Sequence, residues 1–411
     1  MPNPIRMLHF ADLHVGMENY GRLDPETGTS SRVRDFLNRL DEVIAHARDH
    51  NADLVVFAGD AFKTRDPDPT QQREFAHRIK QLADEVPLLL LVGNHDLPGM
   101  AVKATSLDIF NALDVPNVIV GHNPAGRVVE TRSGPLYLAW MPYPMRNRLL
   151  VQEHHRSKSV DELDIALQQA VADMIAALAE EAAQHDMPRV LSGHFSVAEA
   201  KLGSERSVML GRDVAVHNSA LAEPVWDYVA LGHIHKHQDV NGGRYPGVVY
   251  SGSLERIDFG EENEEKGFCW VELMRGETRW QFVPVEARPF ITIRADVRET
   301  EDPTATVTRA IERHTIDDAV VRLLVQLRAD QATQLRDRDL LAAMAAAYSA
   351  SLSKEIEYEA RARIGGLAAE AMTPAQLVER YFVDKGYDAA RVERLVQYAA
   401  QIFEGISSST R

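Results

Sequence analysis

Five short motifs rich in aspartate, histidine and asparagine occur in order along the chain. They are Asp12-Leu13-His14, Gly59-Asp60, Gly93-Asn94-His95-Asp96, Gly193-His194 and Gly232-His233-Ile234-His235. Each follows a short apolar run that is typical of a buried strand. Ligands collect at the carboxyl ends of strands in open α/β sheets, so these side chains are expected to meet at one edge. The glycines remove a Cβ and let the backbone turn sharply beside the polar side chains.

The types of these side chains predict a site for two metal ions. Imidazole, carboxylate and amide groups without a thiolate suit ions such as Mn, Fe or Zn. A carboxylate shared between ions about 3.5–4 Å apart is a common way to hold such a pair, and Asp60 is assigned this bridging role. The remaining ligands are Asp12, His14 and His235 for one ion, and Asn94, His194 and His233 for the other.

This ligand set predicts phosphoester hydrolysis. Two ions would hold the phosphodiester and a water molecule, lower the pKa of that water and neutralise the charge that grows on phosphorus. His95 is left free of metal, and we expect it to stabilise the transition state or to protonate the leaving oxygen. Asp96 is a candidate to orient the loop or the His95 ring. One glycine-histidine pair at a strand end is more often structural, so the prediction depends on all five motifs together.

In this order the motifs resemble the calcineurin-like metallophosphoesterases. Further segments are similar to SbcD-type DNA repair nucleases, bacterial relatives of the double-strand-break nuclease that works with an SMC-like ATPase. These segments are residues 10–16, 59–62, 250–253, 259–261 and 266–268. The resemblance covers about residues 1–270. It implies Mn²⁺ at the seven ligands, His95 as the catalytic histidine, and exonuclease and endonuclease cleavage of DNA.

The chain departs from some relatives in the residues that would hold DNA. Those relatives carry a histidine soon after the Gly-Asp motif, whereas this chain reads Phe62-Lys63-Thr64-Arg65. Lys63 or Arg65 is a candidate for an electrostatic version of that role, with ordinary surface charge as the alternative. Other candidates for phosphate contacts are Arg32, Arg34, Arg146, Arg148, Arg156 and Lys158.

Composition limits the ways in which this protein would bind nucleic acid. The 411 residues carry a net charge of −16, which argues against a surface coated with basic residues. Binding to DNA would then use bound metal, a local basic patch or a partner protein. The acidic residues Glu261, Glu262, Glu264 and Glu265 are most simply a solvated loop.

The single cysteine and the apolar runs bear on compartment. Cys269 is the one cysteine, which excludes an intramolecular disulfide and argues against a cysteine-based zinc site. We expect it to be a small buried residue on a strand. The start of the chain shows no signal peptide, and the apolar runs are too short to span a bilayer. The expected location is the cytoplasm, in association with the nucleoid.

Alternating apolar runs and helical stretches predict a layered α/β domain over residues 1–287. The resemblance implies a four-layer β-sandwich flanked by helices, followed by a small α+β capping domain. This second domain is predicted at residues 288–363 as a β-α-β-α unit, with its last helix at residues 335–350. Residues 364–372 are predicted as a linker.

Two helices are predicted in a C-terminal segment at residues 373–405, where Thr373 and Pro374 form a good helix start. Their apolar stripes could pack on the protein's own body or form a groove for a partner's coiled coil. The resemblance favours an SbcC-type ATPase as that partner. It also implies a homodimer, for which residues 33–49 or 70–84 are candidate interface helices.

Three functions are compatible with these patterns. The first is a metal-dependent DNA nuclease subunit of an SbcC–SbcD-like complex. The second is a phosphoesterase for a small or protein-linked phosphate, which shares the motifs but has no need of the long C-terminal addition. The third is a DNA-tethering subunit with little turnover, against which the complete ligand set argues.

Overall fold

Two six-stranded sheets lie between residues 5 and 284 of the structure, which is a computed structural model. It describes residues 3–26, 28–98, 103–145, 159–203, 213–357 and 373–408. The first sheet has the order β14 (Arg279–Pro284), β13 (Gly267–Leu273), β1 (Ile5–Phe10), β2 (Leu54–Phe57), β3 (Leu88–Leu91) and β4 (Val118–Gly121). Strands β1 to β4 are parallel, and β13 runs antiparallel to β1. The parallel strands bring the ends of β1, β2 and β3 to one edge.

The second sheet supplies the remaining motifs. Its order is β11 (Gln238–Asp239), β12 (Gly247–Tyr250), β10 (Tyr228–Gly232), β7 (Arg189–His194), β6 (Gly134–Met141) and β5 (Ala125–Thr131). Strands β6, β7, β10 and β12 are parallel, so the motifs after β7 and β10 also share an edge. The short strands β8 (Ser196–Val197) and β9 (Ala215–Val216) pair separately.

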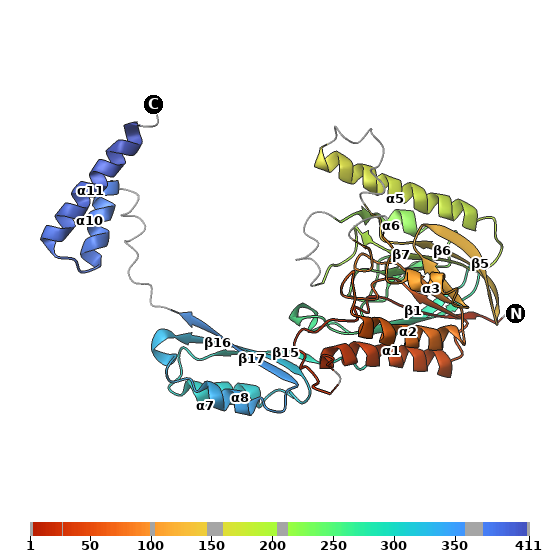
Figure 1. Ribbon diagram of the computed structural model, residues 1–411, viewed down its shortest axis with the longest axis horizontal. Coiled ribbons are helices and arrows are strands. Elements are labelled where there is room, and N and C mark those ends of the chain that lie inside the picture. Colours follow the sequence, from red (N-terminus) through yellow and green to blue (C-terminus); the bar gives the residue numbers. More distant parts are fainter. Residues whose placement is uncertain are drawn as a thin grey trace. The chain divides into compact units, whose positions relative to one another are not determined.

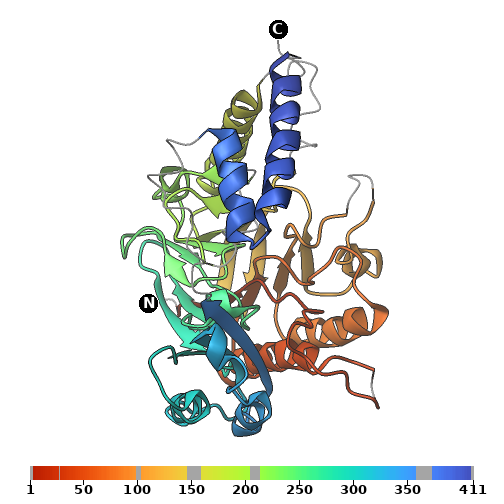
Figure 2. The ribbon, with the colours of Figure 1, turned by 90° about the vertical axis from the view of Figure 1, so that its left-hand side faces the viewer.

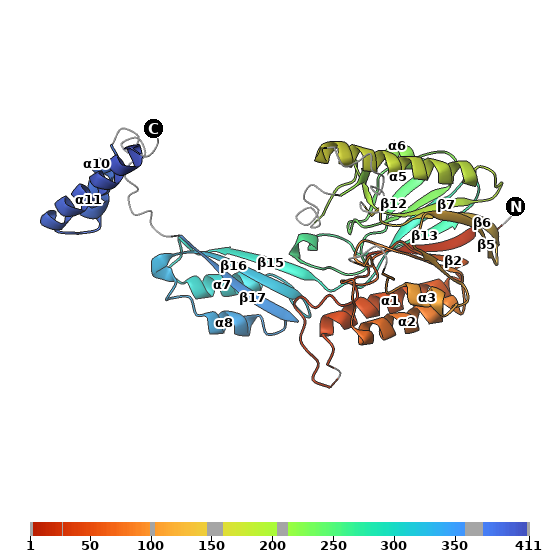
Figure 3. The same ribbon diagram turned by 45° about the horizontal axis from the view of Figure 1, so that its top comes forward.

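Apolar side chains divide this region into four layers. Met7 and Val56 of the first sheet pack with Leu138 and Val190 of the second, so the sheets face each other. The outer face of the first sheet is covered by α1 (Ser31–Asp49) and α2 (Pro69–Ala83), with α3 (Asp108–Ala112) nearby. The outer face of the second sheet is covered by α5 (Val160–Ala182) and α6 (Asn218–Leu221). Figure 3 shows this order of helix, sheet, sheet and helix, which is the predicted four-layer fold.

Local sequence explains where the main helices begin. The Ser30 side chain accepts a hydrogen bond from the Arg32 amide at the start of α1. At the start of α5, Ser159 and Glu162 form a reciprocal capping box. Such caps satisfy amide groups that have no partner within the helix.

A three-stranded sheet follows, in the order β15 (Phe290–Asp296), β16 (Val320–Arg328) and β17 (Ser349–Glu357). Helices α7 (Pro303–Ile311) and α8 (Asp337–Ala343) lie in its connections (Figure 1). The predicted helix at residues 335–350 is present only in its first half, because α8 ends at Ala343 and β17 begins at Ser349. The alanine-rich stretch hid the alternation of half-buried and exposed residues in β17.

The chain divides into two compact units that differ from the predicted domains. One contains Met1–Arg294, Thr308–Leu324 and Asp337–Ser353, and the other contains Ala295–Val307, Val325–Arg336 and Lys354–Arg411. The predicted boundary after residue 287 therefore stays a prediction. Within the second unit, α10 (Pro374–Asp384) and α11 (Ala389–Ser408) lie side by side as a hairpin (Figure 2). The predicted linker at 364–372 lies outside the described residues.

Among the residues that the structure describes, no helix is both long and apolar enough to cross a membrane.

Candidate metal centre

Unusual backbone conformations bring the five motifs together at the strand ends. Asp12, His14, Asp60 and His233 all have positive φ angles, between 47° and 97°. These are rarely adopted by residues other than glycine and occur where surrounding contacts impose them. The amide of Asp12 donates to the Gly59 carbonyl at 3.0 Å, and that of His14 donates to the Asp60 carbonyl at 3.1 Å. The amide of His233 donates to the Asp12 carboxylate at 3.0 Å, which links the two sheets.

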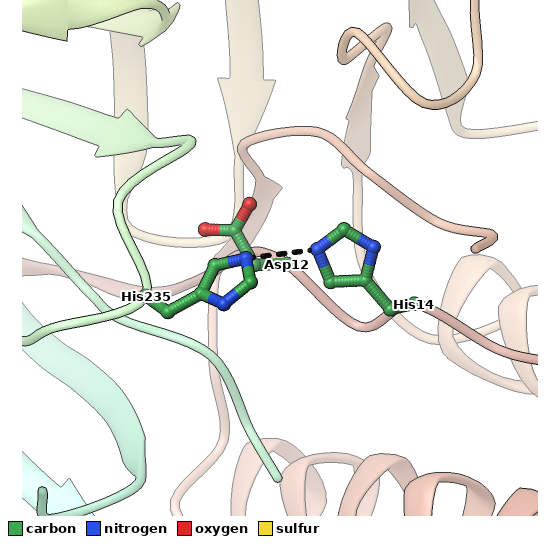
Figure 4. Close-up of side chains that lie close together, drawn as sticks. All are labelled: Asp12, His14 and His235. Atoms are coloured by element: carbon green, nitrogen blue, oxygen red, sulfur yellow. Dashed lines mark hydrogen bonds between the residues drawn. The ribbon is translucent and has the colours of Figure 1, made fainter. Parts of the chain in front are cut away.

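One group of donor atoms comes from Asp12, His14 and His235 (Figure 4). Their potential ligand atoms lie within 4.8 Å of one another, and the three residues are buried. The two Nε2 atoms of His14 and His235 are 3.0 Å apart. Two donors that bind one ion at about 2.1 Å, at right angles, stand about 3 Å apart. The observed spacing therefore fits a shared ion.

A second group of donor atoms comes from Asn94, His194 and His233. The side-chain oxygen of Asn94 lies 3.0 Å from Nε2 of His194 and 2.9 Å from Nδ1 of His233. These separations fit a second shared ion by the same geometry. The structure therefore separates six of the predicted ligands into the two sets that the sequence suggested, although their role as ligands stays a prediction.

Asp60 lies between the two groups. Its Oδ2 is 3.8 Å from Nε2 of His14 and 3.4 Å from Nε2 of His194. Its Oδ1 accepts a hydrogen bond from the His95 amide at 2.8 Å, which leaves Oδ2 facing both histidines. Burial alone would raise the pKa of Asp60, but the surrounding histidines, His194 first, hold it well below its usual range. Asp60 is therefore a buried anion in the position of a bridge.

The charge on Asp60 also acts on the neighbouring histidine. Burial lowers the pKa of His194, but Asp60 and Asp12 outweigh this effect, and the pKa rises to about 9. Buried carboxylates thus attract a positive charge to this position. A divalent ion would supply that charge after displacing the proton.

Each of three histidines is held by a hydrogen-bond acceptor on the side of its ring that faces away from the other donor atoms. Nδ1 of His194 lies 2.7 Å from the Ala58 carbonyl. Nε2 of His233 lies 2.6 Å from the Asp213 carboxylate, and Nδ1 of His235 lies 2.8 Å from the Glu261 carboxylate. Neither carboxylate was predicted from the sequence as part of the site. No local pattern marked Asp213.

The prediction of a solvated acidic loop at residues 261–265 is wrong for its first residue. Glu261 is fully buried, bonded to His235 and 2.9 Å from Nζ of Lys266. Glu262 accepts hydrogen bonds from Thr292, and Glu264 pairs with Lys266 at 3.0 Å. The sequence signal that could have identified Glu261 was the segment at 259–261, which is part of the family resemblance.

His95 lies beside the donor groups, and its ring is held by the main chain. Its Nδ1 lies 2.8 Å from the Lys63 carbonyl, and its ring is 4.8 Å from that of His14, centre to centre. An atom of His95 also lies within 4.8 Å of donor atoms of His14 and Asp60. This arrangement suits a proton donor beside the centre, and the catalytic role of His95 stays a prediction.

Asp96 orients the loop and not the ring. Its carboxylate accepts hydrogen bonds from the amides of Gly93, Asp60 and Ala61, each at 3.0 Å. Burial and the charge of Asp60 raise the pKa of Asp96 to about 7, against the effect of these amides. Asp96 thus ties the loops after β2 and β3 together.

Two glycines are required by close approach. A Cβ on Gly59 would lie 2.2 Å from Nδ1 of His194, and a Cβ on Gly93 would lie 2.1 Å from Oδ1 of Asp60. Neither position has room for a side chain while the donor atoms keep their places. The expectation that the missing Cβ atoms of these glycines leave space beside the polar side chains is confirmed.

The basic residues predicted to contact DNA differ in their exposure to solvent. Arg32 is fully buried, bonded to Asp35 and to the Arg256 carbonyl, so its predicted role on DNA is wrong. Arg65 is exposed, Lys63 is half-buried, and Arg34 is exposed opposite Asp24. The predicted basic cluster of Arg146, Arg148, Arg156 and Lys158 lies outside the described residues.

Comparison with known proteins places this geometry in a family. Residues 5–237 match the family described as calcineurin-like phosphoesterase. The SbcD component of the nuclease SbcCD from Bacillus subtilis (strain 168) is 28% identical over 289 residues, which are 68% of this chain and 69% of that protein. The protein of the same name from Escherichia coli (strain K12) is 27% identical over 66% of each chain.

An archaeal relative extends the comparison. The DNA double-strand break repair protein Mre11 of Archaeoglobus fulgidus is 26% identical over 72% of this chain and 63% of its own length. The chain therefore matches about two thirds of the length of these relatives. It belongs to the calcineurin-like phosphoesterase family, as a metallophosphoesterase related to the SbcD and Mre11 nucleases.

Proposed function

We propose that this protein is the DNA nuclease subunit of an SbcC–SbcD-like repair complex and uses two Mn²⁺ ions. The observation that carries the proposal is the position of Asp60 between two sets of donor atoms, with Oδ2 at 3.8 Å and 3.4 Å from the nearest histidine nitrogens. Such a shared carboxylate is expected of a dinuclear centre and not of a single-ion site. The names of the relatives support DNA as the substrate.

In this proposal the described residues have separate roles in hydrolysis. Bound ions would supply an activated water and offset the charge on the phosphoryl group. Asp12, His14 and His235 would hold one ion, Asn94, His194 and His233 the other, and Asp60 both. Nδ1 of His95 donates to the Lys63 carbonyl, so Nε2 is the nitrogen that would face the leaving oxygen, and it would donate a proton only from the doubly protonated imidazolium.

A partner surface on the C-terminal hairpin is part of the proposal. Helices α10 and α11 enclose an apolar groove of about 450 Å³. It is lined by Leu377, Val378, Tyr381, Phe382, Leu395, Tyr398 and Ala399. Tyr381 and Tyr398 are 52% and 66% exposed, which leaves a large apolar face uncovered. We assign this groove to the coiled coil of an SMC-like ATPase, with residues 373–405 as the docking segment and residues 288–363 as a capping domain.

The subunit would work as a homodimer. Helix α1 or α2 is the proposed interface, on the strength of the family resemblance alone. DNA would then reach two centres in one assembly. Lys63 and Arg65 remain the proposed electrostatic contacts beside each centre.

Nuclease assays on the purified full chain test the catalytic part. With Mn²⁺ the protein should degrade linear duplex DNA and nick single-stranded circles. Asp60→Ala should abolish cleavage, and His95→Ala should slow it by about 10²–10⁴-fold, the usual contribution of a positioned acid or base. His217→Ala, an exposed histidine just before α6, is the matched control and should cleave normally. Unchanged cleavage by His95→Ala contradicts its assigned role.

Two further measurements separate the competing functions. Hydrolysis of bis(p-nitrophenyl) phosphate without cleavage of DNA, with or without the ATPase, would favour a small-molecule phosphoesterase. Binding of DNA by EDTA-treated protein, combined with negligible turnover in Mn²⁺, would favour a tethering subunit. Rapid cleavage that stops on chelation supports the nuclease.

A further inference from the structure

Two histidines only two residues apart present opposite ring nitrogens to the candidate centre. His233 turns Nδ1 toward the Asn94 oxygen, at 2.9 Å, and His235 turns Nε2 toward Nε2 of His14, at 3.0 Å. The outward nitrogens each meet a different carboxylate. Nε2 of His233 lies 2.6 Å from Asp213, and Nδ1 of His235 lies 2.8 Å from Glu261.

These contacts determine which nitrogen of each imidazole ring carries the proton. An ionised carboxylate only accepts hydrogen bonds, so the ring nitrogen that faces it must carry the proton. A neutral imidazole has one such proton, and the opposite nitrogen then keeps a lone pair for a metal ion. Asp213 therefore selects the Nδ1 lone pair of His233, and Glu261 selects the Nε2 lone pair of His235.

Glu261 is itself held firmly as an anion. It is fully buried on a short 3-10 turn, Phe259–Glu261. Its Oε2 lies 2.9 Å from Nζ of Lys266 and accepts the Ile257 amide at 3.0 Å, which leaves Oε1 for His235. An ammonium and an amide N–H both bind this carboxylate, so the contacts keep Glu261 an acceptor toward His235.

The turn that carries Glu261 is anchored on its other side as well. The amide and hydroxyl of Thr292 on β15 donate to the Glu262 carboxylate, at 2.7 Å and 2.5 Å. The Arg322 guanidinium lies 4.2 Å above the centre of the Phe259 ring. The carboxylate that faces His235 is thus fixed in position by contacts on both sides.

Asp213 is held by different groups. Its Oδ1 accepts from the Tyr143 hydroxyl at 2.9 Å, and Ser196 donates a short hydrogen bond to Oδ2, the oxygen that also faces His233. Both hydroxyls donate to Asp213, so its carboxylate is left as an acceptor toward His233. Neither carboxylate belongs to the five motifs, and their own supporting contacts share no residue.

We propose that Glu261 and Asp213 are positioning residues that impose opposite tautomers on His235 and His233, each for a different ion of the centre. This inference rests on the proposed dinuclear function. Glu261 acts on the ion shared by Asp12, His14 and His235. Asp213 acts on the ion shared by Asn94 and His194.

Calorimetric titration of the full, metal-free chain with Mn²⁺ tests the assignment without reference to activity. The wild type should bind two ions. Loss of the carboxylate behind a metal-binding histidine typically weakens binding by about 10–100-fold. Glu261→Ala should weaken one ion by this factor and leave the other unchanged, and Asp213→Ala should weaken the other ion. Equal losses at both ions in each variant would overturn the inference, because they indicate a general structural effect.

Double mutants identify which ion each carboxylate serves. Glu261→Ala should cost nothing further in a His235→Ala background, because the ring on which it acts is gone, but should keep its full effect in a His233→Ala background. Full additivity with His235→Ala would contradict the assigned role. Glu261→Gln keeps an oxygen that can accept from His235 and should retain more affinity than Glu261→Ala.

Glu264→Gln is the matched control, because Glu264 pairs with the same Lys266, whereas the carboxylate bonded to His235 is that of Glu261. It should bind both ions like the wild type. A loss at one ion equal to that of Glu261→Ala would assign the effect to Lys266 and overturn the role of Glu261. If the wild type itself binds fewer than two ions, the proposed dinuclear function fails together with this inference. If it binds two and both alanine variants match it, only this inference fails.

Discussion

Substitution of Asp35 by alanine should destabilise the protein far more than loss of a comparable ion pair elsewhere on the same helix. Asp35 lies on α1 and accepts a hydrogen bond from Nη1 of Arg32 at 2.7 Å. It also accepts two from Arg288, at 2.8 Å and 2.7 Å. The Arg32 side chain is completely buried, and those of Asp35 and Arg288 are 10% and 13% exposed.

The expected loss of unfolding free energy depends on the partners that the guanidinium groups of Arg32 and Arg288 retain. Removal of one partner from a buried ion pair typically costs about 3–5 kcal/mol, because a charge stays behind without compensation. Arg32 would retain the Arg256 carbonyl and Glu255, the latter at 3.8 Å. Arg288 would retain Asp318, which is exposed, and its contact with the Tyr348 ring. These remaining partners place the expected loss near the lower end, about 3 kcal/mol.

Urea denaturation of the full chain, followed by tryptophan fluorescence, measures this loss. Asp41→Ala is the matched control, because Asp41 lies on the same helix and pairs with Arg78 at 2.7 Å but is 47% exposed. An exposed pair contributes about 0–1 kcal/mol. If the two variants lose the same free energy of unfolding, the cluster around Asp35 does not act as a buried network and the reasoning fails.

Three further outcomes are expected. Gly59→Ala should abolish binding of at least one Mn²⁺ ion in calorimetry, because its Cβ would lie 2.2 Å from His194, whereas Gly134→Ala shares a positive φ but meets no atom within 4 Å and should bind normally. Mn²⁺ at about 100 times its Kd should raise the free energy of unfolding by about 2.7 kcal/mol per site, and EDTA should remove this gain in the same urea assay. In metal-free protein the folded pKa of Asp213, about 2, lies below its ordinary value of 3.8. Its contribution of roughly 2 kcal/mol should therefore be present above about pH 4 and lost as the pH falls toward 2, which a comparison of wild type with Asp213→Asn would detect.

The strand-end motifs were predictable because their signal is local. Each polar cluster directly follows an apolar run. Because the strands that follow from these runs are parallel, their carboxyl ends and the polar clusters lie at one edge of each sheet. The apolar runs before Asp12 and Asp60 form β1 and β2 in the structure. The position of Asp60 between two donor groups agrees with the bridging role assigned to it from the sequence.

The supporting residues were not predictable because their partners are distant in sequence. Glu261 lies 26 residues beyond His235, and Asp213 lies 20 residues before His233. In a linear sequence a buried carboxylate of this kind looks the same as a solvated one. Arg32 shows the converse error, since a basic residue near the motifs suggested DNA when its charge is used inside the protein.

The positive φ angles explain why the backbone beside the donor atoms needs many hydrogen bonds to hold it. Each such conformation at a residue other than glycine costs about 1–3 kcal/mol and persists only where its surroundings impose it. Asp12, His14, Asp60 and His233 adopt four of them within one small region. The amides of these residues are held by carbonyls and carboxylates of neighbouring motifs, and Asp96 holds the next loop. The backbone around the donor atoms is therefore arranged by the protein itself, so an entering ion would meet donors that are already spaced to receive it.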